Sequence, residues 1–316
     1  MTEYLVAIDG GGTKTEYLLA DLDGQVVKTI THGPTNITAG SLGQAAYNLR
    51  EGMRLLLEGQ SDYQIASLVM AVAGLDTPKD RQAATSVFRE ILDTDKIRQF
   101  LIVNDAVAAL INGTSELPAV VLVAGTGASC LGKNTRRQMV KVSGLDYLLA
   151  DDGSGYDAGR LTLKAAVQSA DGRGQKTKLQ ELVFSHFGVE NVFELKDEIY
   201  SPLISKEEVA SFAADCLELA RQGDSVARAI IDYCQGQLLL DVQAVATRLG
   251  FADEDFTLIP CGSFLLAMIS EFRELLQTKL PYARLVHPDK TPVYGSLEIA
   301  KRLHAGENVN NFDIFG

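Results

Sequence analysis

The fold of this 316-residue chain is decided by the stretch Leu5-Val6-Ala7-Ile8-Asp9-Gly10-Gly11-Gly12-Thr13-Lys14-Thr15-Glu16-Tyr17-Leu18-Leu19. Residues 5–8 form an apolar run typical of a buried strand, and residues 15–20 favour a second strand. The three consecutive glycines between them remove every Cβ atom from the turn, so a phosphate can approach the backbone N–H groups closely. The stretch therefore predicts a phosphate-binding loop on a β-hairpin. It differs from the loops that bind phosphate at the start of a helix.

Polar groups flank these glycines at positions suited to a phosphate and a metal ion. Thr13 supplies a hydroxyl group and Lys14 supplies a positive charge, while Asp9 ends the first strand and is placed to orient a hydrated Mg²⁺ ion. The alternative is a glycine-rich hairpin with an incidental acid, because short motifs often occur by chance.

Composition narrows the class of protein. The formal net charge of -12 and the pI near 4.9 argue against a nucleic-acid or anionic-membrane partner. The four cysteines are scattered and form no CxxC pair, which argues against a zinc site or a disulfide framework. No apolar run approaches the length of a membrane span, and no leader segment is expected. We therefore expect a cytoplasmic, reduced protein without nucleic-acid or membrane partners, and a homodimer stays open.

The layout of residues 5–24, which is strand, loop, strand and tight turn, recurs in residues 119–142 around the small-residue turn Ala124-Gly125-Thr126-Gly127-Ala128-Ser129. We therefore expect an α/β protein of two duplicated domains, 1–117 and 118–295. The last helix, within 296–316, is expected to pack back on the first domain. One loop from each domain would then face a nucleotide cleft between the two domains.

A second acid stands out at the end of a predicted strand. Residues 100–103 predict an interior strand that is closed by Asn104-Asp105-Ala106, so Asp105 is expected to face the same cleft. There its carboxylate would accept the proton of an attacking hydroxyl group during phosphoryl transfer. The alternative is that Asp105 caps the helix that follows. Later in the chain, a strand over 256–260 runs into Cys261-Gly262-Ser263 and a helix predicted over 264–280.

These pieces occur together in an order that resembles the sugar kinase, Hsp70 and actin superfamily. Within it, residues 7–19, 123–131 and Asp151-Asp152-Gly153-Ser154-Gly155-Tyr156 look most like the N-acetylglucosamine kinases and the related BadF/BadG/BcrA/BcrD ATPase family. The resemblance covers nearly the whole chain. It implies two ribonuclease H-like domains of the actin-like ATPase type, with ATP and Mg²⁺ as cofactors.

The resemblance also implies roles for individual residues. Asp105 would be the catalytic base, and Asp9 would hold Mg²⁺ through water. The ATP-binding residues would be Gly10, Gly11, Gly12, Thr13, Lys14, Gly125, Thr126, Gly127, Ser211, Gly262, Ser263 and Ala267. The sugar-binding residues would be Asn36, Gly74, Asp105, Ser129, Gly144, Leu145, Asp146 and Asp151.

Two positions depart from the pattern of these kinases. The sugar loop usually reads Gly-Trp-Gly where this chain has Gly144-Leu145-Asp146, and an asparagine usually stands where this chain has Ser129. Both departures affect the identity of the sugar more than the use of ATP. Plainer interpretations also exist: Asn36 could be a turn residue after proline, and Asp151 could cap a helix.

The resemblance favours an ATP-dependent kinase that phosphorylates the primary 6-hydroxyl of N-acetylglucosamine or a related hexosamine. Glucosamine, N-acetylmuramate or glucose could be the acceptor instead, with an added acid at Asp146 favouring a cationic 2-amino group if it faces the sugar. A BadF-type ATPase activator of a dehydratase is a second hypothesis, which requires an iron–sulfur cluster on cysteines. A nucleotide switch of the actin or chaperone type is a third.

Overall fold

The computed structural model describes residues 1–12, 14–36, 42–92 and 94–314. The chain forms two compact units. The first unit contains residues 1–121, 131–140 and 286–316, and the second contains residues 122–130 and 141–285. The predicted domain boundary after residue 117 stays a prediction.

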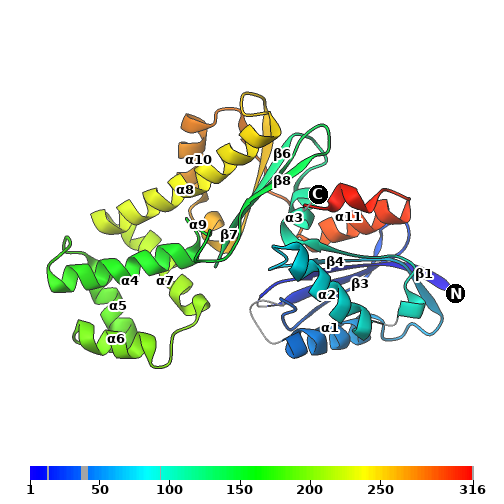
Figure 1. Ribbon diagram of the computed structural model, residues 1–316, viewed down its shortest axis with the longest axis horizontal. Helices are drawn as coiled ribbons and strands as arrows, with labels where there is room; N and C mark the ends of the chain where they lie inside the picture. The colour runs from blue at the N-terminus through cyan, green and yellow to red at the C-terminus, as the bar shows by residue number, and fades with distance from the viewer. Residues whose placement is uncertain (13, 37–41, 93, 315–316) are drawn as a thin grey trace. The chain divides into compact units, whose positions relative to one another are not determined.

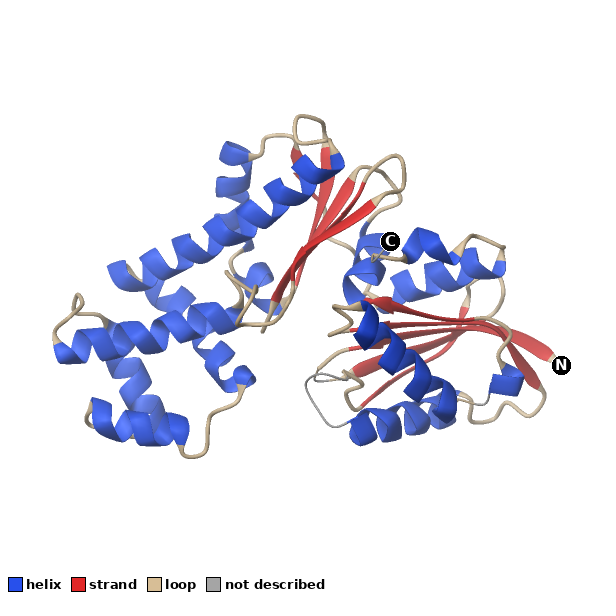
Figure 2. Cartoon of the chain, viewed as in Figure 1, coloured by secondary structure: helices blue, strands red, loops and turns tan. Residues whose placement is uncertain are grey.

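A five-stranded mixed sheet forms the centre of the first unit (Figures 1 and 2). Its order is β3-β2-β1-β4-β5, with β1 antiparallel to β2 and parallel to β4. The strands are β1 (Thr2–Gly10), β2 (Thr15–Ala20), β3 (Val26–His32), β4 (Tyr63–Val72) and β5 (Phe100–Asn104). The glycine loop therefore connects two paired strands, as predicted. The expectation of an interior strand before Asp105 is wrong, because β5 lies at the edge of the sheet.

Helices cover both faces of this sheet (Figure 1). They are α1 (Leu42–Leu56), α2 (Pro78–Ile91), α3 (Asp105–Gly113) and α11 (Val293–His304), with a short 3₁₀ turn at Thr94–Lys96. The α11 helix packs against α3, β1 and β4. Sandwiching the sheet in this way explains why β1 and β4 read as nearly continuous apolar runs rather than as alternating ones.

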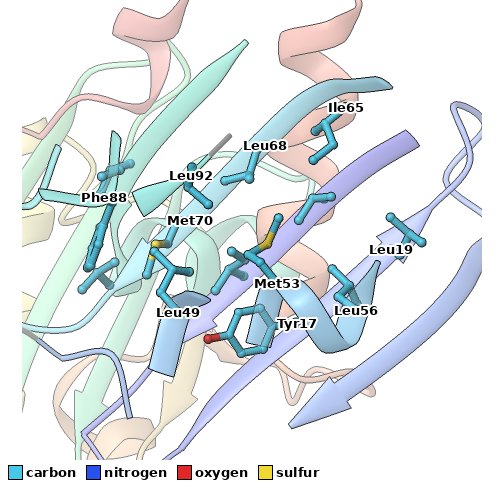
Figure 3. Close-up of a cluster of buried hydrophobic side chains, with 14 of the residues drawn as sticks. Tyr17, Leu19, Leu49, Met53, Leu56, Ile65, Leu68, Met70, Phe88 and Leu92 are labelled. Carbon is cyan, nitrogen blue, oxygen red and sulfur yellow. The ribbon is translucent and has the colours of Figure 1, made fainter. Parts of the chain in front are cut away.

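The core on one face of the sheet joins α1 and α2 to the strands (Figure 3). Leu49 and Met53 of α1 point toward Tyr17 and Met70 of the sheet, and Phe88 of α2 completes the cluster. The Tyr17 hydroxyl group, which is buried, donates to the Asn48 carbonyl oxygen at 3.1 Å. The core thus anchors β2, the strand that leaves the glycine loop.

One glycine sets the distance between α11 and α3. A Cβ atom on Gly295 would lie 1.9 Å from the carbonyl oxygen of Ala108, which is backbone and cannot swing away. Gly295→Ala is therefore expected to destabilise the protein by about 1–3 kcal/mol, the usual range for overpacking. Urea unfolding measures this change. Gly43→Ala is the matched control, because Gly43 lies in α1 and a Cβ atom added there would meet no atom within 4 Å. Equal stability of the two variants would contradict the prediction.

The second sheet repeats the order of the first. Its order is β10-β9-β6-β7-β8. As in the first sheet, the first strand has the next two strands of the chain on one side and two later strands on the other, and β10 is parallel to β9. The strands are β6 (Ala119–Ala124), β7 (Ala128–Lys133), β8 (Met139–Ser143), β9 (Phe256–Cys261) and β10 (Ala283–Leu285). This shared order confirms the predicted duplication.

The second unit is rich in helices. They are α4 (Gly155–Asp171), α5 (Lys178–Phe187), α6 (Val192–Tyr200), α7 (Lys206–Arg221), α8 (Ser225–Leu249), α9 (Ser263–Ala267) and α10 (Ile269–Lys279). The prediction of one helix over 264–280 is wrong, because the chain breaks at Met268 between α9 and α10. A final 3₁₀ turn at Val309–Phe312 belongs to the first unit. None of the helices in the described ranges is both long and apolar enough to cross a membrane.

Candidate active site

The glycine loop of the first unit is closed by backbone hydrogen bonds. The N–H group of Gly11 donates to the Lys14 carbonyl oxygen at 3.0 Å, and the N–H group of Asn36 donates to the Gly11 carbonyl oxygen at 3.3 Å. A Cβ atom on Gly10 would lie 2.3 Å from Oγ1 of Thr35, so only glycine fits there. The loop is thus pinned to the segment that follows β3. The predicted phosphate ligand Thr13 lies outside the described residues.

Lys14 is held by Glu16, an acid that was not among the residues predicted from sequence. The Lys14 Nζ lies 2.6 Å from Oε1 of Glu16, and the Glu16 carboxylate also forms a hydrogen bond with the side chain of Thr291. Partial burial raises the pKa of Glu16, but the bonds with Lys14 and Thr291 lower it overall. Glu16 is therefore ionised and orients Lys14. The closeness of an acid two residues after Lys14 was the available signal.

Asp9 lies in surroundings that favour a bound cation. Burial raises its pKa to about 7, with the neighbouring Asp105 and Glu16 carboxylates contributing to the rise and Lys14 opposing it. Asp9 thus has two carboxylates and one ammonium group near it, so a divalent cation would relieve the excess negative charge. Carboxylate oxygen is the ligand type that Mg²⁺ prefers, usually with water and phosphate oxygens beside one or two carboxylates. Asp9 therefore fits the Mg²⁺ role that the sequence suggested.

Asp105 is the first residue of α3, and Asn104 rather than Asp105 is its N-cap. The Asn104 side chain accepts from the Ala106 N–H group at 3.0 Å, while its Nδ2 donates to the Leu75 carbonyl oxygen at 3.0 Å. The same Ala106 N–H group donates to Oδ1 of Asp105 at 2.9 Å. The cap alternative for Asp105 is therefore wrong. Its position in the first turn of a helix favours the ionised carboxylate that a proton acceptor needs.

Two predicted sugar ligands lie near this group in the same unit. Nδ2 of Asn36 lies 3.8 Å from where a Cβ atom of Gly12 would be, so Asn36 flanks the glycine loop. Gly74 follows β4 in the left-handed conformation with φ 80°, one residue before the Leu75 carbonyl that Asn104 binds. Both therefore belong to the chain segments around Asp9 and Asp105.

In the second unit, the turn at 125–127 is bound by the start of α4. The Gly125 N–H group donates to the Gly127 carbonyl oxygen at 2.9 Å. The first N–H groups of α4, from Gly155 and Tyr156, donate to the carbonyl oxygens of Gly125 and Thr126 at 2.7 and 3.0 Å. The loop is therefore held firmly in place. Its position could be predicted from the sequence, but the helix that supports it could not.

The predicted adenosine residues meet this loop at one point. A Cβ atom on Gly262 would lie 2.4 Å from the Ala124 carbonyl carbon, and a Cβ atom on Gly125 would lie 4.0 Å from the Ser263 nitrogen. Gly262 and Ser263 thus pack directly against the 125–127 loop, although far from it in sequence. Ala267 ends α9, where its carbonyl oxygen accepts from Arg221 at 2.7 Å.

Ser211 is the remaining predicted nucleotide ligand, and it lies on α7. Its hydroxyl group donates to the Glu208 carbonyl oxygen of its own helix at 2.7 Å. The α7 helix packs against α4, where a Cβ atom on Gly159 would lie 1.8 Å from the Val209 carbonyl oxygen. Ser211 therefore lies on the helix that supports α4, and its connection to the 125–127 loop runs through that helix.

Asp151 lies against the same loop in an unusual backbone conformation. Its φ is 122°, which is rare for a residue with a side chain, and such strain is often found at functional sites. Oδ2 of Asp151 lies 2.9 Å from the position of a Gly127 Cβ atom, so glycine leaves room for the carboxylate. The cap of α4 is Ser154, whose side chain accepts from the Asp157 N–H group. The capping alternative for Asp151 is therefore wrong.

The predicted sugar loop, residues 144–146, lies beside Ser129. The Ser129 Oγ is 2.9 Å from the position of a Gly144 Cβ atom, so this pair of predicted ligands is in contact. Leu145 is exposed. Asp146 forms an ion pair with Lys206 of α7 and accepts from the Tyr147 N–H group at 2.8 Å. Partial burial raises the pKa of Asp146, but these two partners lower it overall.

Comparison with known proteins identifies relatives of similar length. The family model for the BadF/BadG/BcrA/BcrD ATPase family matches residues 6–300. The chain is 28% identical over 307 residues to an N-acetylmuramic acid/N-acetylglucosamine kinase of Clostridium acetobutylicum, covering 95% of this chain and 98% of that protein. It is also 28% identical over 272 residues to an N-acetyl-D-glucosamine kinase of Dictyostelium discoideum, covering 82% and 85%.

Solved structures share the fold. A Chromobacterium violaceum protein, provisionally assigned as an N-acetylglucosamine kinase, superposes with a TM-score of 0.78 at 18% identity, covering 94% of this chain and 98% of that one. A ROK family glucokinase of Streptomyces griseus, in complex with glucose and AMPPNP, superposes with a TM-score of 0.52 at 16% identity, covering 95% and 99%. At these identities the likeness establishes the fold, which agrees with the expected one.

Proposed function

Because the chain belongs to the BadF/BadG/BcrA/BcrD ATPase family, we propose that it is an ATP-dependent kinase for N-acetylglucosamine or a closely related amino sugar. The observation that supports this proposal most directly is the similarity to the Clostridium kinase over nearly the full length of both chains. The site adds chemical support, because two closed glycine loops and a helix-start carboxylate are what phosphoryl transfer requires.

The loops would hold the phosphates of ATP. Residues 10–14 offer N–H groups and the Lys14 cation, and residues 125–127 offer N–H groups and the Thr126 hydroxyl. Gly262, Ser263 and Ala267 would line the adenosine, with Ser211 approaching from α7. A magnesium ion held near Asp9 would neutralise charge on the phosphates when bound.

Asp105 would serve as the catalytic base for transfer to the primary hydroxyl of the sugar. The hydroxyl oxygen forms a bond to the γ-phosphorus, the bond from that phosphorus to the β–γ bridging oxygen breaks, and ADP leaves. The hydroxyl proton passes to the Asp105 carboxylate. Asn36 and Gly74 of the first unit would contact the sugar, as would a second-unit set of Ser129, Gly144, Leu145, Asp146 and Asp151.

An ADP-release assay over a panel of acceptors tests this function. N-acetylglucosamine, N-acetylmuramic acid, glucosamine and glucose are compared at equal concentration, with a reaction lacking sugar as the control. The highest kcat/KM is expected for N-acetylglucosamine, and N-acetylmuramic acid is included because the Clostridium relative is named for both sugars. Glucose above every amino sugar, or ADP release that is independent of sugar, would refute the assignment.

The cysteines bear on the hypothesis of an iron–sulfur activator. Cys130, Cys216 and Cys234 are buried, and burial raises the pKa of each thiol, to about 11 for Cys216. An iron–sulfur cluster needs several cysteines together, and these three buried side chains lie on separate elements, β7, α7 and α8. The geometry therefore favours the kinase over the activator.

The pairing of Asp146 bears on sugar preference. Lys206 neutralises this acid, so Asp146 is not free to select a cationic 2-amino group. Asp146→Gly is expected to change the ratio of kcat/KM for glucosamine over N-acetylglucosamine by less than about 5-fold, because exposed ion pairs contribute roughly 0–1 kcal/mol. Glycine also suits the left-handed backbone at this position, where φ is 70°. Steady-state kinetics with both sugars, with Lys206→Met alongside, measures the ratio. A fall of about tenfold or more in Asp146→Gly would make Asp146 a specificity residue.

A further inference from the structure

A hydrogen bond between side chains fixes the point where β8 runs into residues 144–146. Oγ of Ser143, the last residue of β8, donates to Oδ2 of Asp241 in the middle of α8 at 2.7 Å. The bond joins residues 98 positions apart, so it ties the start of the loop to the long helix of the same unit. It is a direct side-chain contact through which α8 can set the loop's conformation.

The backbone at this point needs such support. Ser143, Gly144 and Asp146 all have left-handed φ values, of 54°, 65° and 70°. Residues with side chains adopt this region at an energetic cost, and they persist there only when surrounding structure holds them. The Ser143–Asp241 bond acts on the first of the three, where the strand must turn.

Two polar side chains, those of Lys141 and Ser129, lie beside the turn at Gly144. Nζ of Lys141 donates to the Gly144 carbonyl oxygen at 2.9 Å, and Oγ of Ser129 lies 2.9 Å from the position of a Gly144 Cβ atom. The Ser129 Oγ is buried and has no hydrogen-bond partner in the described structure. A buried hydroxyl without a partner is costly, which is consistent with a group kept for a ligand.

The buried carboxylate of Asp241 lowers the stability of the folded chain. Burial raises its pKa to about 6, with the nearby Asp152 contributing to the rise and the Ser143 hydroxyl opposing it. Its pKa in the folded chain thus lies above the ordinary value of 3.8, so the ionised carboxylate opposes folding at neutral pH. Burial of the carboxylate therefore costs stability, and the hydrogen bond from Ser143 offsets part of that cost.

We propose that Asp241 is a positioning residue that, through Ser143, holds residues 144–146 in the conformation that binds the amino sugar. The part of this inference that concerns sugar binding rests on the proposed function. The part that concerns the order of residues 144–146 is independent of it. Loss of the bond lowers the fraction of molecules with a competent loop, which raises the KM for sugar and leaves ATP binding unchanged.

Kinetics of Ser143→Ala and Asp241→Ala, singly and together, test the proposal. Each single variant is expected to raise the KM for N-acetylglucosamine about tenfold, the effect of losing a hydrogen bond to a charged group, with the KM for ATP within about 2-fold. The double variant is expected to be no worse than the worse single one, because both remove the same bond. Asp241→Asn, which keeps an acceptor oxygen, is expected to restore part of the loss. Asp232→Ala is the control, an exposed acid on the same helix.

Hydrogen exchange of the amides in residues 144–150 provides a readout that needs no substrate. Exchange is expected to be faster in Ser143→Ala and Asp241→Ala than in wild type and Asp232→Ala. Unchanged exchange, or equal rises in both KM values, would overturn the proposal. Faster exchange with an unchanged KM for sugar would overturn the link to sugar binding. Lack of any sugar phosphorylation by wild type would instead defeat the proposed function, and with it the sugar part of this inference.

Discussion

Asp105→Asn is expected to lower kcat by about 10²–10⁴-fold, the contribution usual for a positioned general base. The substitution keeps the shape of the side chain and removes the proton acceptor. Asn104 would still cap α3, since its own side chain makes that bond, so the helix is expected to stay in place. Single-turnover measurement of sugar phosphate formation gives the rate.

Affinity for ATP separates a lost base from a damaged site. We expect the dissociation constant for ATP to stay within about 2-fold in Asp105→Asn, because the phosphate loops are unchanged. Asp95→Asn is the control, an exposed acid of the same unit for which full activity is expected. Turnover of Asp105→Asn near that of wild type would show that another group accepts the proton.

Gly262→Ala is expected to raise the KM for ATP by at least about tenfold and to destabilise the protein by about 1–3 kcal/mol. The added Cβ atom would lie 2.4 Å from the Ala124 carbonyl carbon and 2.8 Å from the Gly125 nitrogen, so the 125–127 loop would have to move. The left-handed φ of 89° adds strain for any residue with a side chain.

A second glycine isolates the effect of the clash. Gly250 caps α8 with a similar φ of 77°, but no atom lies within 4 Å of its Cβ position. Gly250→Ala therefore carries the strain of a positive φ without a clash, although its ψ of 29° differs from the 143° of Gly262. Its KM for ATP is expected to match wild type. Calorimetry for stability and steady-state kinetics for ATP measure both variants. An equal KM in the two variants would mean that Gly262 does not shape the nucleotide site.

The framework of the fold could be predicted from local signals. The apolar run in β1 and the glycines after it located the first hairpin, and Thr77 with Pro78 marked the start of α2, where the structure shows a capping box. Asp224, a residue type favoured at the start of a helix, likewise caps α8. Such signals depend on a few neighbouring residues, so they can be recognised without knowledge of the tertiary structure.

Other parts depended on contacts distant in sequence. Gly155 and Gly159 make α4 a poor helix by propensity, but Gly159 is needed because α4 approaches the Val209 carbonyl oxygen closely. The break at Met268 between α9 and α10 has neither glycine nor proline to announce it. The edge position of β5 likewise follows from strand pairing, which the local pattern does not contain.

The same division applies to the site. The glycine loops and the acids at strand ends could be predicted from the sequence, because turn formation and charge depend on residues that are adjacent in the chain. Glu16, Lys206 and Asp241 could not, because each matters through a partner that folding brings close: Lys14, Asp146 and Ser143. A partner can also change the role expected of a residue that the sequence singles out. Lys206 does this for Asp146 by forming an ion pair with it.

The most direct test of the central claim is ³¹P NMR of the reaction of purified protein with ATP, Mg²⁺ and N-acetylglucosamine. The expected result is one sugar phosphate, formed in equal amount to ADP, whose phosphorus couples to the protons on C6. Inorganic phosphate and ADP without a sugar phosphate would contradict the kinase function, and coupling to the proton on C1 would contradict transfer to the primary hydroxyl.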